Sequence, residues 1–101
     1  MACNVRIQLT AVKELEGIVS YLAVFSSQAA EGFLKKWEQM LEELRDGMVE
    51  HRFSHFSVLA RLGYCTIIIG DYIVLYFNDG DTVVIAHIFH QSQDYANIVV
   101  G

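Results

Sequence analysis

The stretch HIFHQSQDY, residues 87–95, gathers side chains suited to acid–base chemistry. His87 and His90 can each donate or accept a proton at neutral pH, because a free histidine titrates near ~6.5. Asp94 adds a carboxylate, and Tyr95 can stack on a base or position a phosphate. The same residue types also suit a polar strand end that meets water, so the elements around them must decide between the two interpretations.

The two histidines are three residues apart on an expected strand, so alternation places them on opposite faces of the sheet. No cysteine or acid spacing completes a zinc site around them, so neither a metal nor a cofactor is expected. His90 is either a proton-transfer group or a polar residue that fixes the turn after the strand, and we favour the second. His87 is expected to be half-buried, beside the helices or at an interface. For Tyr95, base stacking and packing on the sheet carry equal weight.

The basic side chains form one loose group before and at the start of the second expected strand, at His51, Arg52, His55 and Arg61. We expect a solvated rim or a contact with an acidic partner there. Cys65 has no cation beside it in the sequence, so it is expected in the core and not as a reactive thiol.

Composition favours a single folded domain over residues 1–101, since 53% of the side chains are hydrophobic and 19% are charged. The formal net charge is −5, and no run of lysine or arginine appears, which argues against binding to free nucleic acid. Two cysteines and no signal peptide favour free thiols in a reducing cytoplasm. No apolar run is long enough to predict a transmembrane helix.

Hydrophobic periodicity predicts the order β-α-α-β-β-β. Alternating residues 3–9 predict the first strand, and Thr10 is a candidate cap for a helix over residues 11–25. The pair Ser26-Ser27 predicts a break and the cap of a second helix that stops near Gly47. The apolar face of the second helix is expected to hold Ala30, Phe33, Leu34, Trp37, Leu41 and Leu44. Residues 48–60 are expected to be a connecting segment, partly extended. Residues 64–69, 72–77 and 82–90 predict the last three strands, joined by turns at Gly70-Asp71 and at Asp79-Gly80.

These elements predict an α+β fold in which a helical hairpin packs on one face of a small, mostly antiparallel four-stranded sheet. The stretch LGYCTIIIGDYIVLYFNDGDTVVIAHIFHQSQDY, Leu62–Tyr95, resembles the ParE-like branch of the RelE/ParE superfamily of toxins from type II toxin–antitoxin systems. The pieces that carry the resemblance are Gly63-Tyr64, Asp71-Tyr72, and His90 with Asp94-Tyr95. The stretch IVSYLAVFSSQAAEGFLKKWEQMLEEL likewise resembles the helical hairpin of that superfamily.

The resemblance implies a cytoplasmic toxin that inhibits growth, acts in plasmid stabilization and is neutralised by a cognate antitoxin protein. The implied target is either the ribosome with its mRNA or DNA gyrase, with no membrane partner. A homodimer and a heterotetramer with the antitoxin are both left open. The implied catalytic candidates are His90, Tyr95 and Arg61, and the candidates for target or antitoxin binding are Arg52, His55, Arg61, His87 and Asp94.

The chain departs from the superfamily at three places that usually carry basic residues. Cys65 and Ile73 stand where arginine is usual, and Gln91, Ser92 and Gln93 follow the last strand where basic residues are usual. Phosphoryl transfer develops negative charge that needs positive neighbours. We therefore rank a non-enzymatic inhibitor above an mRNA endonuclease, with a decayed member that only binds a partner as the third alternative.

Overall fold

The computed structural model describes residues 4–47, 54, 57–93 and 99 of the chain. The described elements follow one another as β1 (Asn4–Ile7), α1 (Leu9–Phe25), α2 (Ser27–Arg45), α3 (Ser57–Arg61), β2 (Cys65–Ile69), β3 (Tyr72–Asp79) and β4 (Thr82–His90). The strands form one four-stranded sheet in the order β1-β4-β3-β2. β1 runs parallel to β4, whereas the β2–β3 and β3–β4 pairs are antiparallel. The predicted α+β architecture is confirmed.

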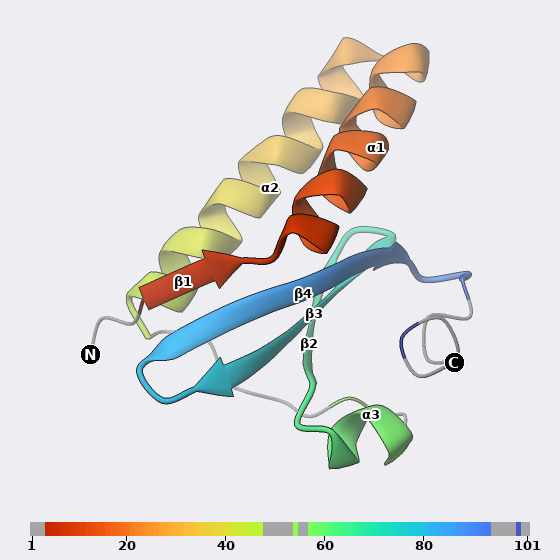
Figure 1. The fold of residues 1–101 in the computed structure, drawn as a ribbon. Coiled ribbons are helices and arrows are strands. Elements are labelled where there is room, and N and C mark those ends of the chain that lie inside the picture. Colours follow the sequence, from red (N-terminus) through yellow and green to blue (C-terminus); the bar gives the residue numbers. More distant parts are fainter. Residues whose placement is uncertain (1–3, 48–53, 55–56, 94–98, 100–101) are drawn as a thin grey trace.

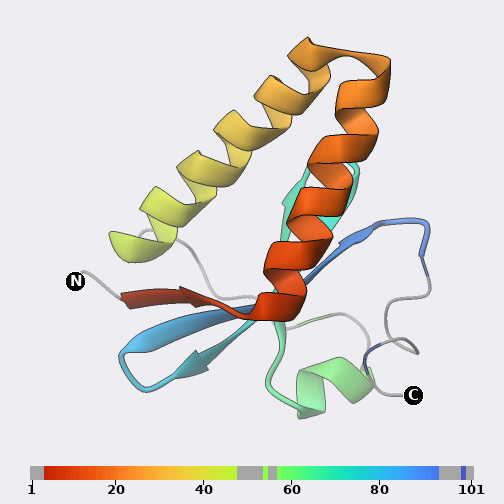
Figure 2. The ribbon, with the colours of Figure 1, turned by 45° about the horizontal axis from the view of Figure 1, so that its top comes forward.

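The helices α1 and α2 form an antiparallel hairpin that covers one face of the sheet, and its tip extends beyond the strands (Figures 1 and 2). Helix α2 turns a continuous apolar stripe inward, because its buried residues recur at intervals of three and four. These residues are Ala30, Phe33, Trp37, Met40 and Leu44. Leu34 and Leu41, which were also expected on this face, are partly buried, while Met40 was not expected there.

The opposite face of the sheet has its own apolar cluster. Leu59 of α3 is fully buried there against Ile73, Leu75 and Phe89. The prediction of a connecting segment over residues 48–60 is wrong where α3 begins, at Ser57. A helix of five residues is too short to show a helical period in sequence, and the burial of its leucine against the sheet stabilises it instead.

The start of α1 differs from the prediction as well. The helix begins at Leu9, so this residue is not part of the first strand and is exposed, and Thr10 lies inside the helix without capping it. The backbone of Gln8 makes the transition: its N–H donates to the carbonyl of Ile85 on β4, and its own carbonyl accepts from the N–H of Val12. The chain therefore passes from a strand edge into a helix with no side-chain cap.

The break between the helices is confirmed. The hydroxyl of Ser26 accepts a hydrogen bond from the backbone N–H of Ala29 at 3.3 Å, which caps α2. At the other end Gly47 adopts a φ of 70° just after the helix, as a C-terminal stop requires.

A two-residue turn and a β-bulge set the register of the β3–β4 hairpin and so the faces to which its side chains point. The turn is Gly80-Asp81, because Asp79 still pairs with Thr82, so the predicted turn pair is one residue too early. Glycine at the first central position, with a φ of 64°, suits a tight hairpin turn. Further along, Leu75 pairs with His87 but Tyr76 pairs with Ile85, which leaves Ala86 as the extra residue of a β-bulge.

Candidate functional site

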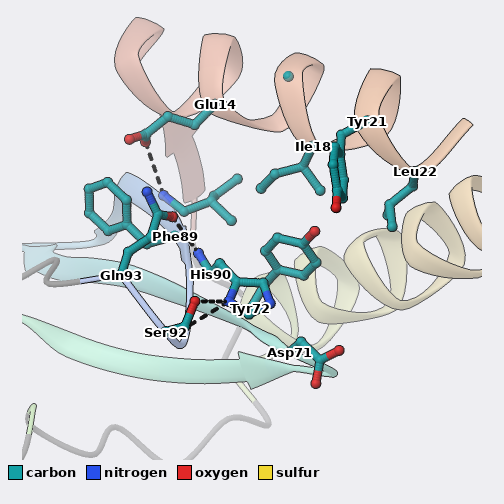
Figure 3. A pocket seen from close by; sticks show the side chains of 12 residues that line it. Glu14, Ile18, Tyr21, Leu22, Asp71, Tyr72, Phe89, His90, Ser92 and Gln93 are labelled. Carbon is teal, nitrogen blue, oxygen red and sulfur yellow. Dashed lines mark hydrogen bonds between the residues drawn. The ribbon is translucent and has the colours of Figure 1, made fainter. Parts of the chain in front are cut away.

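A groove of about 850 Å³ lies between α1 and the adjoining ends of β3 and β4. It is lined from α1 by Glu14, Gly17, Ile18, Tyr21 and Leu22, and from the strand ends and the turn after β4 by Asp71, Tyr72, Ile88, Phe89, His90, Ser92 and Gln93. Figure 3 shows that the helix supplies one wall and the strand ends supply the other. The groove therefore contains the C-terminal part of β4 that the sequence singled out.

The bulge at Ala86 decides which histidine faces this groove. Val83 and Ile85 point to the helices before the bulge, and Ile88 points to them after it. Alternation then sends His90 to the groove, while His87 and Phe89 point to the other face, where their rings stack at a centroid distance of 5.2 Å. The prediction that the two histidines lie on opposite faces is confirmed.

His90 organises the turn that follows β4. Its backbone N–H donates to the side-chain carbonyl of Gln93 at 2.8 Å, and its ring Nδ1 lies 2.7 Å from the Ser92 hydroxyl. The backbone N–H of Ser92 also donates to Nδ1, at 3.1 Å. Because a donor nitrogen would repel that N–H, Nδ1 acts as an acceptor, and Nε2 carries the proton of the neutral ring. These contacts match the turn-fixing role favoured for His90.

Two tyrosines form the aromatic part of the groove. Tyr72 is 9% exposed and sits edge-on to the rings of Phe33 and His90, at centroid distances of 5.2 and 5.3 Å. Burial raises the pKa of Tyr72 above its ordinary value, and the nearby Tyr21 and Asp71 raise it further. Tyr21 hangs from α1 over the same space (Figure 3) and is 59% exposed. One wall ring is thus fixed and the other faces water.

The charges that line the groove are negative. Glu14 and Asp71 contribute carboxylates, and none of the described lining residues is a lysine or an arginine. Such a surface disfavours an incoming phosphate, because like charges repel at short range. The electrostatics therefore point away from an anionic ligand.

Glu14 also holds the free edge of β4. Strand β1 pairs with β4 only as far as Ile85, and beyond that point one Glu14 oxygen, Oε1, accepts the backbone N–H of Ile88 at 3.0 Å. His87 Nδ1 lies 3.4 Å from the same carboxylate, and its side chain is 20% exposed. The expectation that His87 is half-buried is confirmed; its ring lies on the face away from the helices, at the edge of β4 that Glu14 of α1 reaches.

The other candidate residues are dispersed. Arg61 is exposed at the end of α3 and does not line the groove, so the structure does not bring it to His90. Tyr95, Asp94, Arg52 and His55 lie outside the described residues.

Cys65 is 2% exposed, as expected of a core residue. Within the described part of the chain, no group of three or more histidine, cysteine or acidic side chains is placed to hold a metal ion.

Sequence reasoning missed the residues on the α1 side of the groove. Glu14 and Tyr21 sit on a helix whose apolar positions were recognised, but their roles depend on distant segments: Glu14 contacts Ile88 of β4, and Tyr21 shares the groove with Tyr72 of β3. One signal was available. Glu14 interrupts the apolar face between Ala11, Leu15 and Ile18, where an acid needs a partner.

Comparison with known proteins relates this chain to a family of toxins. Residues 5–95 match the family model described as the ParE toxin of the type II toxin–antitoxin system parDE. No curated protein matches the chain in sequence. In the described region, no helix combines the length and hydropathy required to cross a membrane.

Two solved structures share the fold. A chain of the chromosomal ParDE toxin–antitoxin system from P. aeruginosa superposes with a TM-score of 0.69 at 14% identity, covering 88% of this chain and 96% of that one. A chain of the toxin–antitoxin complex RelBE2 from Mycobacterium tuberculosis superposes with a TM-score of 0.54 at 21% identity, covering 92% of this chain and 95% of that one. At these identities the likeness is one of fold.

Proposed function

This chain belongs to the ParE toxin family of type II toxin–antitoxin systems, and we propose that it inhibits growth by binding a macromolecular target, without cutting RNA, until a cognate antitoxin neutralises it. DNA gyrase is the expected target class. The observation that carries the proposal is the charge of the groove around His90, where Glu14 and Asp71 stand without a lysine or arginine among the described lining residues. A site that cleaves RNA must stabilise the negative charge of a phosphoryl-transfer transition state, and carboxylates oppose that.

The positions at which this chain lacks basic residues support the same proposal, because their side chains serve the fold. Cys65 is 2% exposed in the main core, and Ile73 is 5% exposed in the cluster under α3. The amide nitrogen of Gln91 donates to the carbonyl of Gly70 at 2.8 Å, which ties the end of β4 to the β2–β3 turn. A charged side chain at Cys65 or Ile73 would be buried at a cost of several kcal/mol.

His90 itself favours endonuclease activity as the competing function, because an imidazole at a strand end beside Tyr72 is suited to proton transfer. Its ring Nδ1 is already used by Ser92, which leaves Nε2 as the nitrogen open to a substrate. Among the described lining residues, no lysine or arginine stands beside this group to stabilise the negative charge that the reaction develops.

A cognate antitoxin is the expected partner, because the two solved relatives above belong to toxin–antitoxin systems. Strand β2 lies at one edge of the sheet and exposes Ile68, which is 65% accessible. Among the described strands β2 has a neighbour on one side only, and such an edge with an apolar side chain suits pairing with an added strand. Sedimentation of the purified pair would separate a heterodimer from a heterotetramer.

The test is controlled induction of the chain alone and together with the product of the adjacent gene. We expect growth arrest that the neighbour relieves, intact mRNA by mapping of 5′ ends, and loss of DNA supercoiling by purified gyrase when the purified chain is added. The His90→Ala variant should remain as toxic as the parent chain. RNA cleavage that disappears in His90→Ala would overturn the proposal in favour of an endonuclease. Normal growth with abundant soluble protein would favour a member that only binds its partner.

A further inference from the structure

The hydroxyl of Tyr72 is a polar group with no hydrogen-bond partner among the described residues, although its side chain is about nine-tenths buried. Figure 3 shows it directed into the groove, toward Tyr21 of α1. The ring is buried but the hydroxyl faces the groove, so a ligand or water in the groove can supply the partner that the described residues do not. This group therefore marks the groove as a place where a hydrogen-bonding ligand fits.

The groups around this hydroxyl select the charge of the ligand. Glu14 Oε1 already accepts from Ile88, whereas among the described residues Oε2 has only the distant His87 Nδ1, at 3.4 Å. Asp71 lies at the rim, and its side chain has no lysine or arginine partner among the described residues. Carboxylates accept hydrogen bonds and a tyrosine hydroxyl can accept one as well. The complementary ligand is a cation rich in N–H donors, and the aromatic ring of Tyr21, which is 59% exposed, favours a cation too.

An apolar strip continues from the groove to the tip of the helical hairpin. Tyr21, Val24 and Phe25 are 59%, 81% and 70% exposed, and their spacing of three and four places them on one face of α1. The rings of Tyr21 and Phe25 pack edge to face at 5.0 Å. From Ile18 to Phe25 the strip extends roughly 10 Å along the helix. A partner segment covers that length with about three extended residues or about seven helical ones.

We propose that this groove binds an arginine or lysine side chain of the antitoxin, and that apolar residues next to that side chain in the antitoxin cover Tyr21, Val24 and Phe25. The identity of the partner rests on the proposed function, whereas the cation-binding chemistry of the groove does not. Charge complementarity carries the choice of occupant, because the chain has a net charge of −5, and Glu14 and Asp71 line this site with no lysine or arginine among the described lining residues.

The chain offers a matched pair of variants to test the charge. Asp71 and Asp81 occupy the same place in two Gly-Asp hairpin turns, at opposite ends of strand β3. Asp71 lines the groove and Asp81 does not. Asp71→Asn and Asp81→Asn therefore remove the same charge from the same kind of turn, and they differ in their distance from the groove.

The first probe is a blocked seven-residue peptide with one central arginine flanked by leucines, and its control carries neutral citrulline in place of arginine. Titration of the ¹⁵N-labelled chain should shift the amide signals of Gly17, Tyr72 and Ser92, with the citrulline peptide binding at least about fivefold more weakly. Asp71→Asn should weaken arginine-peptide binding about fivefold, whereas Asp81→Asn should leave it unchanged. Equal binding of both peptides, or shifts confined to other surfaces, would overturn the proposed cation site.

The second measurement is the affinity of the full-length adjacent gene product for the two variants. A loss of about fivefold for Asp71→Asn, with parental affinity for Asp81→Asn, is the expected result. An unchanged affinity, together with specific binding of the arginine peptide, would overturn the antitoxin as occupant. A change in the sedimentation of the chain alone in Asp71→Asn would instead point to a second copy of the chain, which also overturns that assignment. A chain that binds the arginine peptide but arrests no growth would refute the proposed function without refuting the cation site.

Discussion

Replacing Glu14 by alanine should lower the free energy of unfolding by about 2 kcal/mol. In the native protein Glu14 Oε1 accepts the backbone N–H of Ile88 at 3.0 Å, at a point where β1 no longer pairs with β4. Ile88 is 2% exposed, so water does not readily replace the lost acceptor. A buried donor left unsatisfied costs roughly 1–3 kcal/mol, and the 3.4 Å contact with His87 is too long to add much.

Urea unfolding followed by circular dichroism measures this loss, and thermal unfolding should show a decrease in Tm of about 10 °C. Two variants separate the hydrogen bond from other effects. Glu16→Ala removes an exposed acid from the same helix and corrects for the better helix propensity of alanine. Glu14→Gln removes the charge but keeps an oxygen that can accept from Ile88, so it should lose less than half as much stability as Glu14→Ala.

The reasoning would be refuted if Glu14→Ala were as stable as Glu16→Ala within about 0.5 kcal/mol. That result would mean that water or a neighbouring carbonyl satisfies the Ile88 N–H at no cost. An equal loss in Glu14→Gln and Glu14→Ala would be a different failure. It would assign the stabilisation to the negative charge and not to the hydrogen bond.

Three further predictions concern ionisation and backbone conformation. Burial raises the pKa of the Cys65 thiol above 9.0 and that of the Tyr76 hydroxyl above 10.0. At alkaline pH both groups therefore stay protonated in the folded protein, whereas the same groups lose their protons in the unfolded chain. Stability should be fully retained below pH 9.0 and fall as the pH rises further, and unfolding in alkaline urea should show a shallower fall in Tyr76→Phe. Gly17→Ala should raise the free energy of unfolding by about 1 kcal/mol, since its added Cβ meets no atom within 4 Å inside a helix. Gly80→Ala should lower it by about 1–2 kcal/mol in the same urea assay, because the φ of 64° strains any residue with a Cβ.

The sequence by itself determined the elements whose signals are local. The last strand was predicted with its observed bounds, Thr82–His90, because β-branched and aromatic residues are enriched in it and a glycine turn precedes it. Helix α2 was predicted from its apolar stripe, and its cap was predicted at Ser26-Ser27 from the preference for a hydroxyl there; the structure shows that Ser26 is the cap. The resemblance to the ParE-like branch, carried by Leu62–Tyr95, was confirmed over residues 5–95.

The site could be predicted only in part. The sequence identified the end of β4 and its two histidines, and alternation placed them correctly on opposite faces. Periodicity alone could not say which face His90 would take, because the bulge at Ala86 shifts the alternation and arises from the pairing of β4 with β3. The sequence also grouped Arg61 with His90 as catalytic candidates, whereas the fold places it at the end of α3 and away from the groove.

Contacts between distant segments were decided by the tertiary structure. Glu14 reaches Ile88 across 74 positions because α1 crosses the free edge of β4 just beyond the last residue that pairs with β1. The same crossing sets Tyr21 opposite Tyr72 and gathers two carboxylates at one groove. Helix and strand periods report which face of an element is apolar, since that depends on neighbours within a few residues. Which polar groups meet between elements depends on how those elements pack, and here the packing formed an acidic groove beside His90.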